Sequence, residues 1–275
     1  MRFGRRVQSP VEGMLSRAAI EAGVGVDPTR TGKAAVIAHF SAVPRVSRSV
    51  EEIVRQLTAL GYICILVSTS PAVGPLTWPN GLPGDTIVVR RTNEGYDFGS
   101  WAVGLAMFPE MRRLDLVILT NDSMAGPFAP IDGFVDAFEN SPVEVWAITD
   151  SHQISHHLQS YFIGFRGGVL DDRPWRTFFG GIEDLDEKMD IVLRYEFGIM
   201  RTCRREAYSW NALYKASDLG VGLQNPTLAG WRKLIALGYP FLKRTIVADP
   251  STAPDGDQVE RIVRRRFGVE LAQWL

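Results

Sequence analysis

The sequence predicts an α/β fold in which a mostly parallel central sheet is flanked by helices. Short apolar runs of about five residues, the length of buried strands, alternate with segments whose apolar residues recur at helical spacing. Turns rich in Gly, Pro, Ser and Asn separate these segments. Such an alternation is typical of βαβ units, in which successive strands run parallel and helices cover the sheet.

The first half of the chain shows this alternation most clearly. Apolar residues recur at helical spacing over 49–60, and Gly61 follows directly, as expected for a C-terminal cap. The other helices expected in this half are 97–108 and 131–138. The expected strands are 34–38, 62–67, 86–89, 114–119 and 143–148.

The second half is less regular, and the first 33 residues differ from the rest. We interpret residues 1–33, which mix Arg, Gly, Ser and Pro, as an N-terminal extension that is flexible or forms one amphipathic helix within 11–22. We expect residues 34–275 to form a single domain. The second half predicts a strand over 158–165 and helices over 187–205, 227–237 and 257–267.

Composition and charge exclude several classes of protein. The 30 Lys and Arg residues balance 31 Asp and Glu residues, so no overall field attracts nucleic acid, and we expect no nucleic-acid partner. No apolar run approaches the roughly 18–20 residues of a membrane helix, and we expect no signal peptide. Cys64 and Cys203 lie too far apart for a metal or redox motif. A cytoplasmic globular protein is therefore expected.

Polar residues follow almost every predicted strand of the first half. In open parallel sheets, ligands bind at the carboxyl ends of the strands, so these residues are candidates for a binding site. Ordinary loops are also polar, and that alternative stays open. The residues concerned are His39, Ser68 to Ser70, Arg90 to Asn93, Asn121 to Ser123 and Thr149 to Ser151.

The apolar run 114–119 ends in the most distinctive of these polar groups, Asn121-Asp122-Ser123. A carboxylate at the end of a buried parallel strand is well placed to hold a divalent ion against a diphosphate. The alternative is that the three residues cap the following turn. Asp122 is therefore a candidate ligand for Mg²⁺ or Mn²⁺.

The segment 90–101 combines cations, carboxylates and glycines between a predicted strand and helix. Arg91 and Asn93 could bind a ligand, and Asp97 could cap the helix or bind sugar hydroxyls. The segment has no GxGxxG pattern and no Walker lysine, so neither a dinucleotide fold nor a P-loop enzyme is indicated. The alternative is a helix cap with a surface ion pair.

Three of the four histidines fall within 150–161. His152 and His156 are four residues apart, a spacing that on a helix would suit zinc. No Glu stands beside a histidine, and no third ligand is obvious from the sequence. A polar wall of a substrate pocket, containing Asp150, His157 and Gln159, is the favoured interpretation.

Two further features could carry chemistry. Glu196 is flanked by apolar residues, and if it points into a pocket, burial would raise its pKa and suit a general base. A solvated helix glutamate is the alternative. Lys243 and Arg244 follow an aromatic, proline-containing turn and could face a diphosphate or form a solvated pair.

Eight short motifs in consistent order resemble the rhamnan synthesis F family. Together they extend over about residues 34–246. The motifs are His39-Phe40, Arg91 to Trp101, Thr120 to Ser123 with Gly126-Pro127, Trp146 to Asp150, His157 to Phe162, Tyr195 to Gly198, Asn225 to Thr227 and Pro240 to Arg244.

The resemblance implies an inverting glycosyltransferase of bacterial surface-polysaccharide synthesis with a GT-A-like fold. The implied donor is a dTDP-sugar, dTDP-L-rhamnose above all, and the acceptor is a glycan or lipid-linked glycan. Residues 34–150 would form the nucleotide-sugar half and 151–275 the acceptor and catalytic half. Because lipid-linked acceptors lie at the inner membrane, the basic helix 257–267 could make a peripheral contact there or remain solvated.

The resemblance also assigns roles to individual residues. Asn121 to Ser123 take the place of the Asp-x-Asp metal motif, with Asn121 replacing the first carboxylate, so metal dependence is left open. Glu196 stands where the base is placed, although Glu-Phe-Gly replaces the common Glu-Asp pair. Asp150, His157 and Gln159 would bind the acceptor or sugar. The implied donor-binding residues are His39, Ser68, Ser70, Arg91, Asn93, Asp97, Asn121, Asp122, Lys243 and Arg244.

Two rival functions remain at this stage. A non-catalytic carbohydrate-binding or assembly subunit could keep the fold without turnover. The observation that supports this alternative is Asn121, which stands in place of a carboxylate. A zinc hydrolase could be built on His152, His156 and His157.

Overall fold

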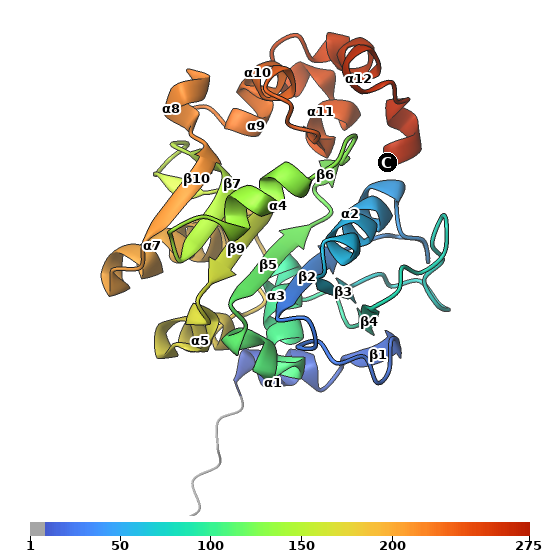
Figure 1. Ribbon diagram of the computed structural model, residues 1–275, viewed down its shortest axis with the longest axis vertical. Coiled ribbons are helices and arrows are strands. Elements are labelled where there is room, and N and C mark those ends of the chain that lie inside the picture. The colour runs from blue at the N-terminus through green and yellow to red at the C-terminus, as the bar shows by residue number, and fades with distance from the viewer. Residues whose placement is uncertain (1–8) are drawn as a thin grey trace, which may run out of the picture.

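The computed structural model describes residues 9–275 and has the predicted α/β architecture (Figure 1). Its central sheet has the strand order β1-β4-β3-β2-β5-β9-β7-β10, and β8 pairs with β7 at one end. Neighbouring strands among β2, β3, β4 and β5 are parallel, as are β7 and β10. β9 is antiparallel to both β5 and β7, and β1 is antiparallel to β4. The sheet is therefore mostly parallel, with a GT-A-like arrangement of its strands.

The strands and helices have the following bounds. The strands are β1 (Ala19–Ala22), β2 (Lys33–His39), β3 (Ile63–Ser68), β4 (Thr86–Arg90), β5 (Leu116–Asn121), β6 (Met124–Ala125), β7 (Val145–Ser151), β8 (His157–Leu158), β9 (Phe162–Arg166), β10 (Trp210–Tyr214) and β11 (Leu242–Lys243). The α-helices are α1 (Pro10–Leu15), α2 (Arg48–Ala59), α3 (Tyr96–Met107), α4 (Asp132–Glu139), α5 (Arg173–Gly180), α6 (Lys188–Ile191), α7 (Phe197–Glu206), α8 (Ala216–Leu219), α9 (Pro226–Ala229), α10 (Trp231–Ala236), α11 (Arg244–Ala248) and α12 (Val259–Phe267).

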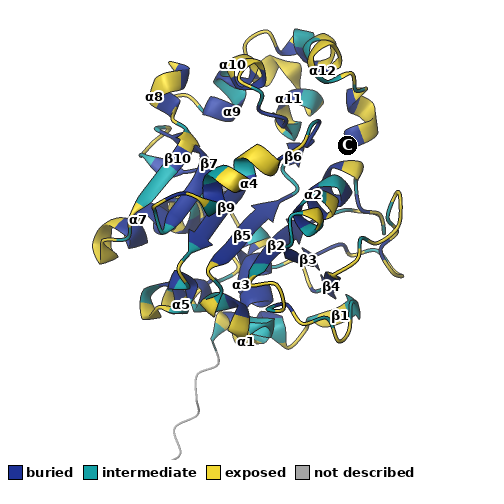
Figure 2. Cartoon of the chain, in the orientation of Figure 1, coloured by how far each residue is buried: buried dark blue, intermediate teal, exposed yellow. Residues whose placement is uncertain are grey.

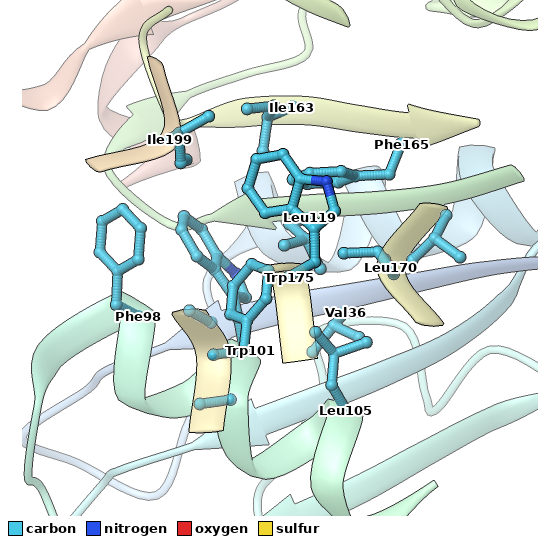
Figure 3. Packing of buried hydrophobic residues seen from close by; sticks show 14 of the residues in the cluster. Val36, Phe98, Trp101, Leu105, Leu119, Ile163, Phe165, Leu170, Trp175 and Ile199 are labelled. Carbon is cyan, nitrogen blue, oxygen red and sulfur yellow. The ribbon is translucent and has the colours of Figure 1, made fainter. Parts of the chain in front are cut away.

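The central strands are buried on both faces, which explains their continuous apolar sequences (Figure 2). Successive side chains of β2 point to opposite faces, so Val36 packs into one core cluster and Ile37 into another. The first cluster contains Trp101 of α3 and Trp175 of α5, which Figure 3 shows between the helices and the sheet. The second contains apolar residues of α2 and α4, so helices cover both faces.

A third core cluster belongs to the C-terminal part of the chain. It joins Trp231 and Ile235 of α10 to Val263 of α12 and to Phe128, just after β6. β6 also pairs antiparallel with β11, so this part is tied to the segment that follows β5. In Figure 1 the helices α8 to α12 gather at the same end of the molecule as β6.

Within residues 9–33 the structure differs from the expected single helix over 11–22. The helix α1 ends at Leu15, and Ala19–Ala22 form the strand β1 at the edge of the main sheet. Pairing with β4 gives the backbone of this segment hydrogen bonds that outweigh its weak helical pattern. Residues 1–8 of the predicted extension lie outside the described residues.

Two other expectations need correction in detail. The strand expected over 158–165 is divided into β8 and β9, with Gln159 to Tyr161 between them. The helix expected over 187–205 is present, but its segment Val192–Glu196 is a π-helical turn between α6 and α7. Such turns occur often at functional sites, and this one ends at Glu196.

No helix within residues 9–275 has both the length and the apolar character that crossing a bilayer would require.

Candidate active site

The ends of four parallel strands come together as predicted. In the sheet register, His39 at the end of β2 lies beside Ser68 at the end of β3, and Ser68 lies beside Arg90 at the end of β4. On the other side of β2, Ala38 pairs with Asn121 at the end of β5. Because these strands are neighbours and parallel, their polar ends lie along one edge of the sheet.

Three adjoining cavities lie along this edge. The outer cavity has a volume of about 810 Å³, the middle cavity about 460 Å³ and the inner cavity about 260 Å³. Phe40 lines both the outer and the middle cavity, and Ser123 lines both the middle and the inner cavity. The three cavities are therefore neighbours along the edge of the sheet, and each could form one subsite for a ligand.

The outer cavity lies against the ends of β3 and β4. Ser70 and Asn93 line it, as predicted for donor binding. Arg91 also lines it, but its guanidinium donates to the carbonyl oxygens of Glu94 and Tyr96, at 2.7 and 3.0 Å, and to Ser100 Oγ at 2.9 Å. Burial lowers the pKa of Arg91 to about 10. Arg91 therefore holds the backbone of the loop before α3, which differs from the predicted donor contact.

The middle cavity is built around Asp122. The Oδ2 atom of Asp122 accepts a hydrogen bond from the backbone N–H of Phe40 at 2.7 Å. Burial raises the pKa of this carboxyl group, while that N–H and the charge of Arg244 act in the opposite direction. The carboxylate of Asp122, which directly follows β5, thus holds the loop between β2 and α2 through the N–H of Phe40.

Arg244 enters the middle cavity from α11. One terminal nitrogen of its guanidinium donates to Ser47 Oγ at 2.8 Å, and its backbone N–H donates to the Ser123 carbonyl at 3.1 Å. Its Nε atom is buried and has no hydrogen-bond partner among the described residues. A buried donor of this kind costs free energy unless a ligand satisfies it, so Arg244 is a candidate for binding an anionic group.

His39 lies in the same cavity as a neutral group. Its Nδ1 atom is 3.0 Å from Ser68 Oγ. Burial lowers the pKa of the imidazole to about 4, and the charges of Arg244 and Arg90 act in the same direction. Ser68 is buried and does not line the outer or middle cavity, so it positions His39 rather than contacting a ligand there.

The inner cavity brings the predicted base together with polar side chains from β5 and α3. Glu196 Oε1 accepts hydrogen bonds from the backbone N–H of Ser160 at 2.9 Å and from its hydroxyl at 3.1 Å. Asp97, Asn121 and Lys243 line the same cavity. Lys243 and Arg244, predicted to act as a pair, are thus divided between two adjoining cavities.

The hydrogen-bond partners of Asn121 favour an amide over a carboxylate at this position. Its Nδ2 donates to Asp97 Oδ2 at 2.7 Å, and its Oδ1 accepts from the N–H and hydroxyl of Ser123, at 3.1 and 2.7 Å. A carboxylate at position 121 would be a like charge at hydrogen-bond distance from Asp97. The amide therefore orients both neighbours without repulsion.

The polar wall predicted over 150–161 is present in part. His157 and Gln159 line the inner cavity, with the His157 ring 4.6 Å from that of Phe197 and Gln159 Nε2 3.2 Å from Asn225 Oδ1. Asp150 does not line this cavity, because its Oδ1 accepts from the Ala216 N–H at 2.6 Å and its Oδ2 lies 2.9 Å from His156 Nε2.

Several lining residues were given no role in the site from the sequence. Arg45 and Ser47 line the middle cavity, and Ser160 and Asn225 line the inner cavity. Asn225 was named only as part of the motif Asn225 to Thr227, which is a typical helix start, and its side chain accepts from the Thr227 N–H at 3.0 Å. Arg45 lies in a loop with no sequence pattern, so only the fold reveals it.

Comparison with known proteins shows the family of this chain. The family model for rhamnan synthesis protein F matches residues 84–271, more than half of the chain. This match includes the ends of β4 and β5, the π-helical turn at Glu196 and the segment of Lys243 and Arg244.

Two curated relatives were compared with the chain. Virulence protein VirA of Vibrio anguillarum is 27% identical over 223 residues, which cover 70% of this chain and 71% of that protein. Protein y4gN of Sinorhizobium fredii, described as uncharacterized, is 23% identical over 163 residues, or 56% of this chain and 43% of that protein.

Proposed function

Since the chain belongs to the rhamnan synthesis protein F family and has a role in polysaccharide synthesis, we propose that it is an inverting glycosyltransferase. We take the donor to be a dTDP-sugar, with L-rhamnose the favoured sugar, and the acceptor to be a growing bacterial surface glycan. The observation that carries the proposal is that Glu196 lines a cavity which adjoins the cationic cavity of Arg244 through Ser123.

The three cavities suggest how a nucleotide-sugar would lie. The nucleoside would occupy the outer cavity, and the diphosphate would lie in the middle cavity, where the guanidinium of Arg244 can donate to a phosphate oxygen. The sugar would then enter the inner cavity, where Asp97 and Gln159 can bind its hydroxyl groups. This order places the anomeric carbon where the middle and inner cavities meet.

The reaction would be a single displacement. An acceptor hydroxyl oxygen attacks the anomeric carbon while the bond from that carbon to the phosphate oxygen breaks, and Glu196 takes the hydroxyl proton. The transition state resembles an oxocarbenium ion, as in glycosyl transfer generally. Arg244 and Lys243, on either side of Ser123, would stabilise the charge of the departing diphosphate.

The side chains at the end of β5 fit a two-carboxylate metal site poorly. Both ends of the Asn121 amide are occupied by Asp97 and Ser123, which leaves Asp122 as the carboxylate of the motif. Asp122 already faces the charge of Arg244 and the N–H of Phe40. We therefore derive no step through Mg²⁺ or Mn²⁺, and assign the neutralisation of charge to the cationic side chains.

Release of dTDP from dTDP-L-rhamnose in the presence of a rhamnose-containing acceptor tests the proposal. E196Q should lower kcat by roughly 10²- to 10⁴-fold, because general-base catalysis contributes about that factor. The affinity for dTDP should be unchanged. E183Q is the matched control, since Glu183 is an exposed partner of Arg194 and does not line the cavity.

Turnover and ligand binding together distinguish the catalytic proposal from the proposal of a carbohydrate-binding subunit. Wild-type turnover in E196Q would overturn the role of Glu196. Glycan binding by the wild-type protein without binding of any nucleotide-sugar, with or without Mg²⁺ or Mn²⁺, would identify a carbohydrate-binding subunit instead.

A further inference from the structure

A second cluster of chemically active side chains lies outside the three cavities, at the hairpin that joins β7 to β8. We propose that Asp150, His152 and His156 bind one divalent transition-metal ion of the zinc type, which fixes this hairpin. One potential ligand atom from each residue lies within 4.8 Å of the others. The proposed site is distinct from the glycosyl-transfer site and does not depend on that function.

The hairpin, and not a helix, brings the two histidines together. Asp150 and Ser151 pair with Leu158 and His157, so residues 152–156 form the connecting loop. His152 and His156 are the first and last residues of this loop. Their rings are stacked at 4.3 Å between centroids with an interplanar angle of 2°. Since imidazole lone pairs lie in the plane of the ring, one of the two rings has to rotate for both to bind the same ion. The third member of the set is therefore Asp150, a residue that the sequence pattern did not identify as a partner of the histidines.

Asp150 is prepared to act as a ligand. Its side chain is buried, and its Oδ1 is fixed by the N–H of Ala216 at the start of α8. Its Oδ2 faces His156 Nε2 at 2.9 Å. A metal ion could take both atoms as ligands when the ring proton of His156 is on Nδ1, because Nε2 then offers its lone pair. In protein metal sites, a carboxylate that ligates through one oxygen is typically oriented by a hydrogen bond to the other, as the Ala216 N–H provides here.

The ligand types select the class of ion. Two imidazoles and one carboxylate suit zinc and its neighbours in the first transition series, whereas Mg²⁺ and Ca²⁺ prefer sites made of oxygen atoms alone. His152 and His156 are half-buried, so an ion can reach them from solvent. With three protein ligands, the remaining positions would hold water.

His157 does not belong to this set. Its Nδ1 lies 2.7 Å from the Ser155 carbonyl, and its ring contacts Phe197 beside the inner cavity. The trio of histidines considered for a zinc hydrolase is therefore not assembled.

The loop that the ion would fix contributes to the inner cavity. Gln153 and Ile154, which lie between the two histidines, both line that cavity. Ile154 also has a positive φ of 66°, a strained conformation for a β-branched residue. Metal binding would hold this wall of the cavity in one conformation.

Calorimetric titration of the full-length protein with Zn²⁺ tests the inference, after removal of any polyhistidine tag and of metal by a chelator. Wild type should bind one Zn²⁺ per chain, and its Tm should rise with Zn²⁺. H152Q and H156Q should each weaken binding by at least about tenfold, since even the loss of an outer-shell partner has an effect of that size.

H157Q is the matched control, because it removes a histidine from the same hairpin but outside the set. It should keep wild-type Zn²⁺ affinity. Unfolding curves recorded with chelator establish that H152Q and H156Q are folded, and visible absorption of bound Co²⁺ gives an independent measure of coordination. Absence of stoichiometric binding to wild type would overturn the inference, as would equal affinity in H152Q, H156Q and H157Q.

Discussion

The imidazole of His39 is buried at the end of β2, where Arg244 and Arg90 oppose a positive charge on it. Because its pKa is lowered to about 4, His39 is neutral near pH 7 and can share a hydrogen bond with Ser68. In the unfolded chain the same imidazole has its ordinary pKa near 6.5. The difference links the protonation of one residue to the stability of the whole protein.

The sign of this linkage gives a pH prediction. Between about pH 6.5 and pH 4 the unfolded chain binds a proton at His39 that the folded protein does not, so stability decreases as the pH falls. The full loss below pH 4 is about 3 kcal/mol. H39Q should remove this part of the pH dependence, measured by urea unfolding from pH 4 to 8. An identical pH profile in H39Q and wild type would contradict the prediction.

At the scale of elements, the sequence predicts the buried parallel strands well and the edge strands poorly. β2, β3 and β5 are continuous apolar runs because both of their faces are covered. β1 and β10 are partly exposed edge strands, and their sequences show no comparable run. Pairing with β4 and with β7, rather than local preference, makes these two segments strands.

The packing of α4 on β9 leads to a prediction about two glycines. A Cβ atom at Gly164 of β9 would lie 2.2 Å from the ring of Phe138, whereas one at Gly133 of α4 would have no atom within 4 Å. G164A should therefore destabilise the protein by about 1–3 kcal/mol, because the ring must move in a tightly packed core. G133A is the control, because Gly133 lies in α4, the helix that carries Phe138. It should stabilise the protein by about 0.5–1 kcal/mol.

Chemical unfolding of both variants checks this prediction. A G164A variant as stable as G133A would show that the α4–β9 contact can yield without cost. The comparison separates steric overlap from the general effect of replacing glycine, because both substitutions add the same methyl group.

At the scale of the whole molecule, the site depends on contacts between distant parts of the chain. The meeting of the strand ends follows from parallel topology, so the sequence was sufficient to predict His39, Asn121 and Asp122 at one edge. The separate positions of Lys243 and Arg244 depend on the pairing of β11 with β6. No local sequence pattern indicates that pairing. The hairpin that brings Asp150 close to His152 and His156 is likewise not indicated by a local pattern.

Arg244 connects the C-terminal part to the strand ends, and its removal should weaken donor binding. R244Q should lower the affinity for dTDP by roughly 10- to 100-fold, since a hydrogen bond to a charged group contributes about 1.5–3 kcal/mol. R232Q is the control, because Arg232 forms an exposed ion pair with Asp255 in the same part of the chain. Calorimetry with dTDP measures both, and equal affinities in R244Q and R232Q would exclude the assigned phosphate contact.

The reversed direction of β9 has a consequence for how such a site can diversify. Phe162, the first residue of β9, pairs with Thr120 near the end of β5, so the segment just before β9 reaches the same edge as the parallel strand ends. Ser160 and Tyr161 enter the inner cavity in this way, from a segment that contributes nothing to the outer cavity. Changes of length in the hairpin 151–158 would thus remodel one wall of the inner cavity while the β2–β4 strand ends keep their register. Chimaeras that exchange this hairpin between relatives should inherit the preference for the transferred sugar from one parent and the nucleotide preference from the other.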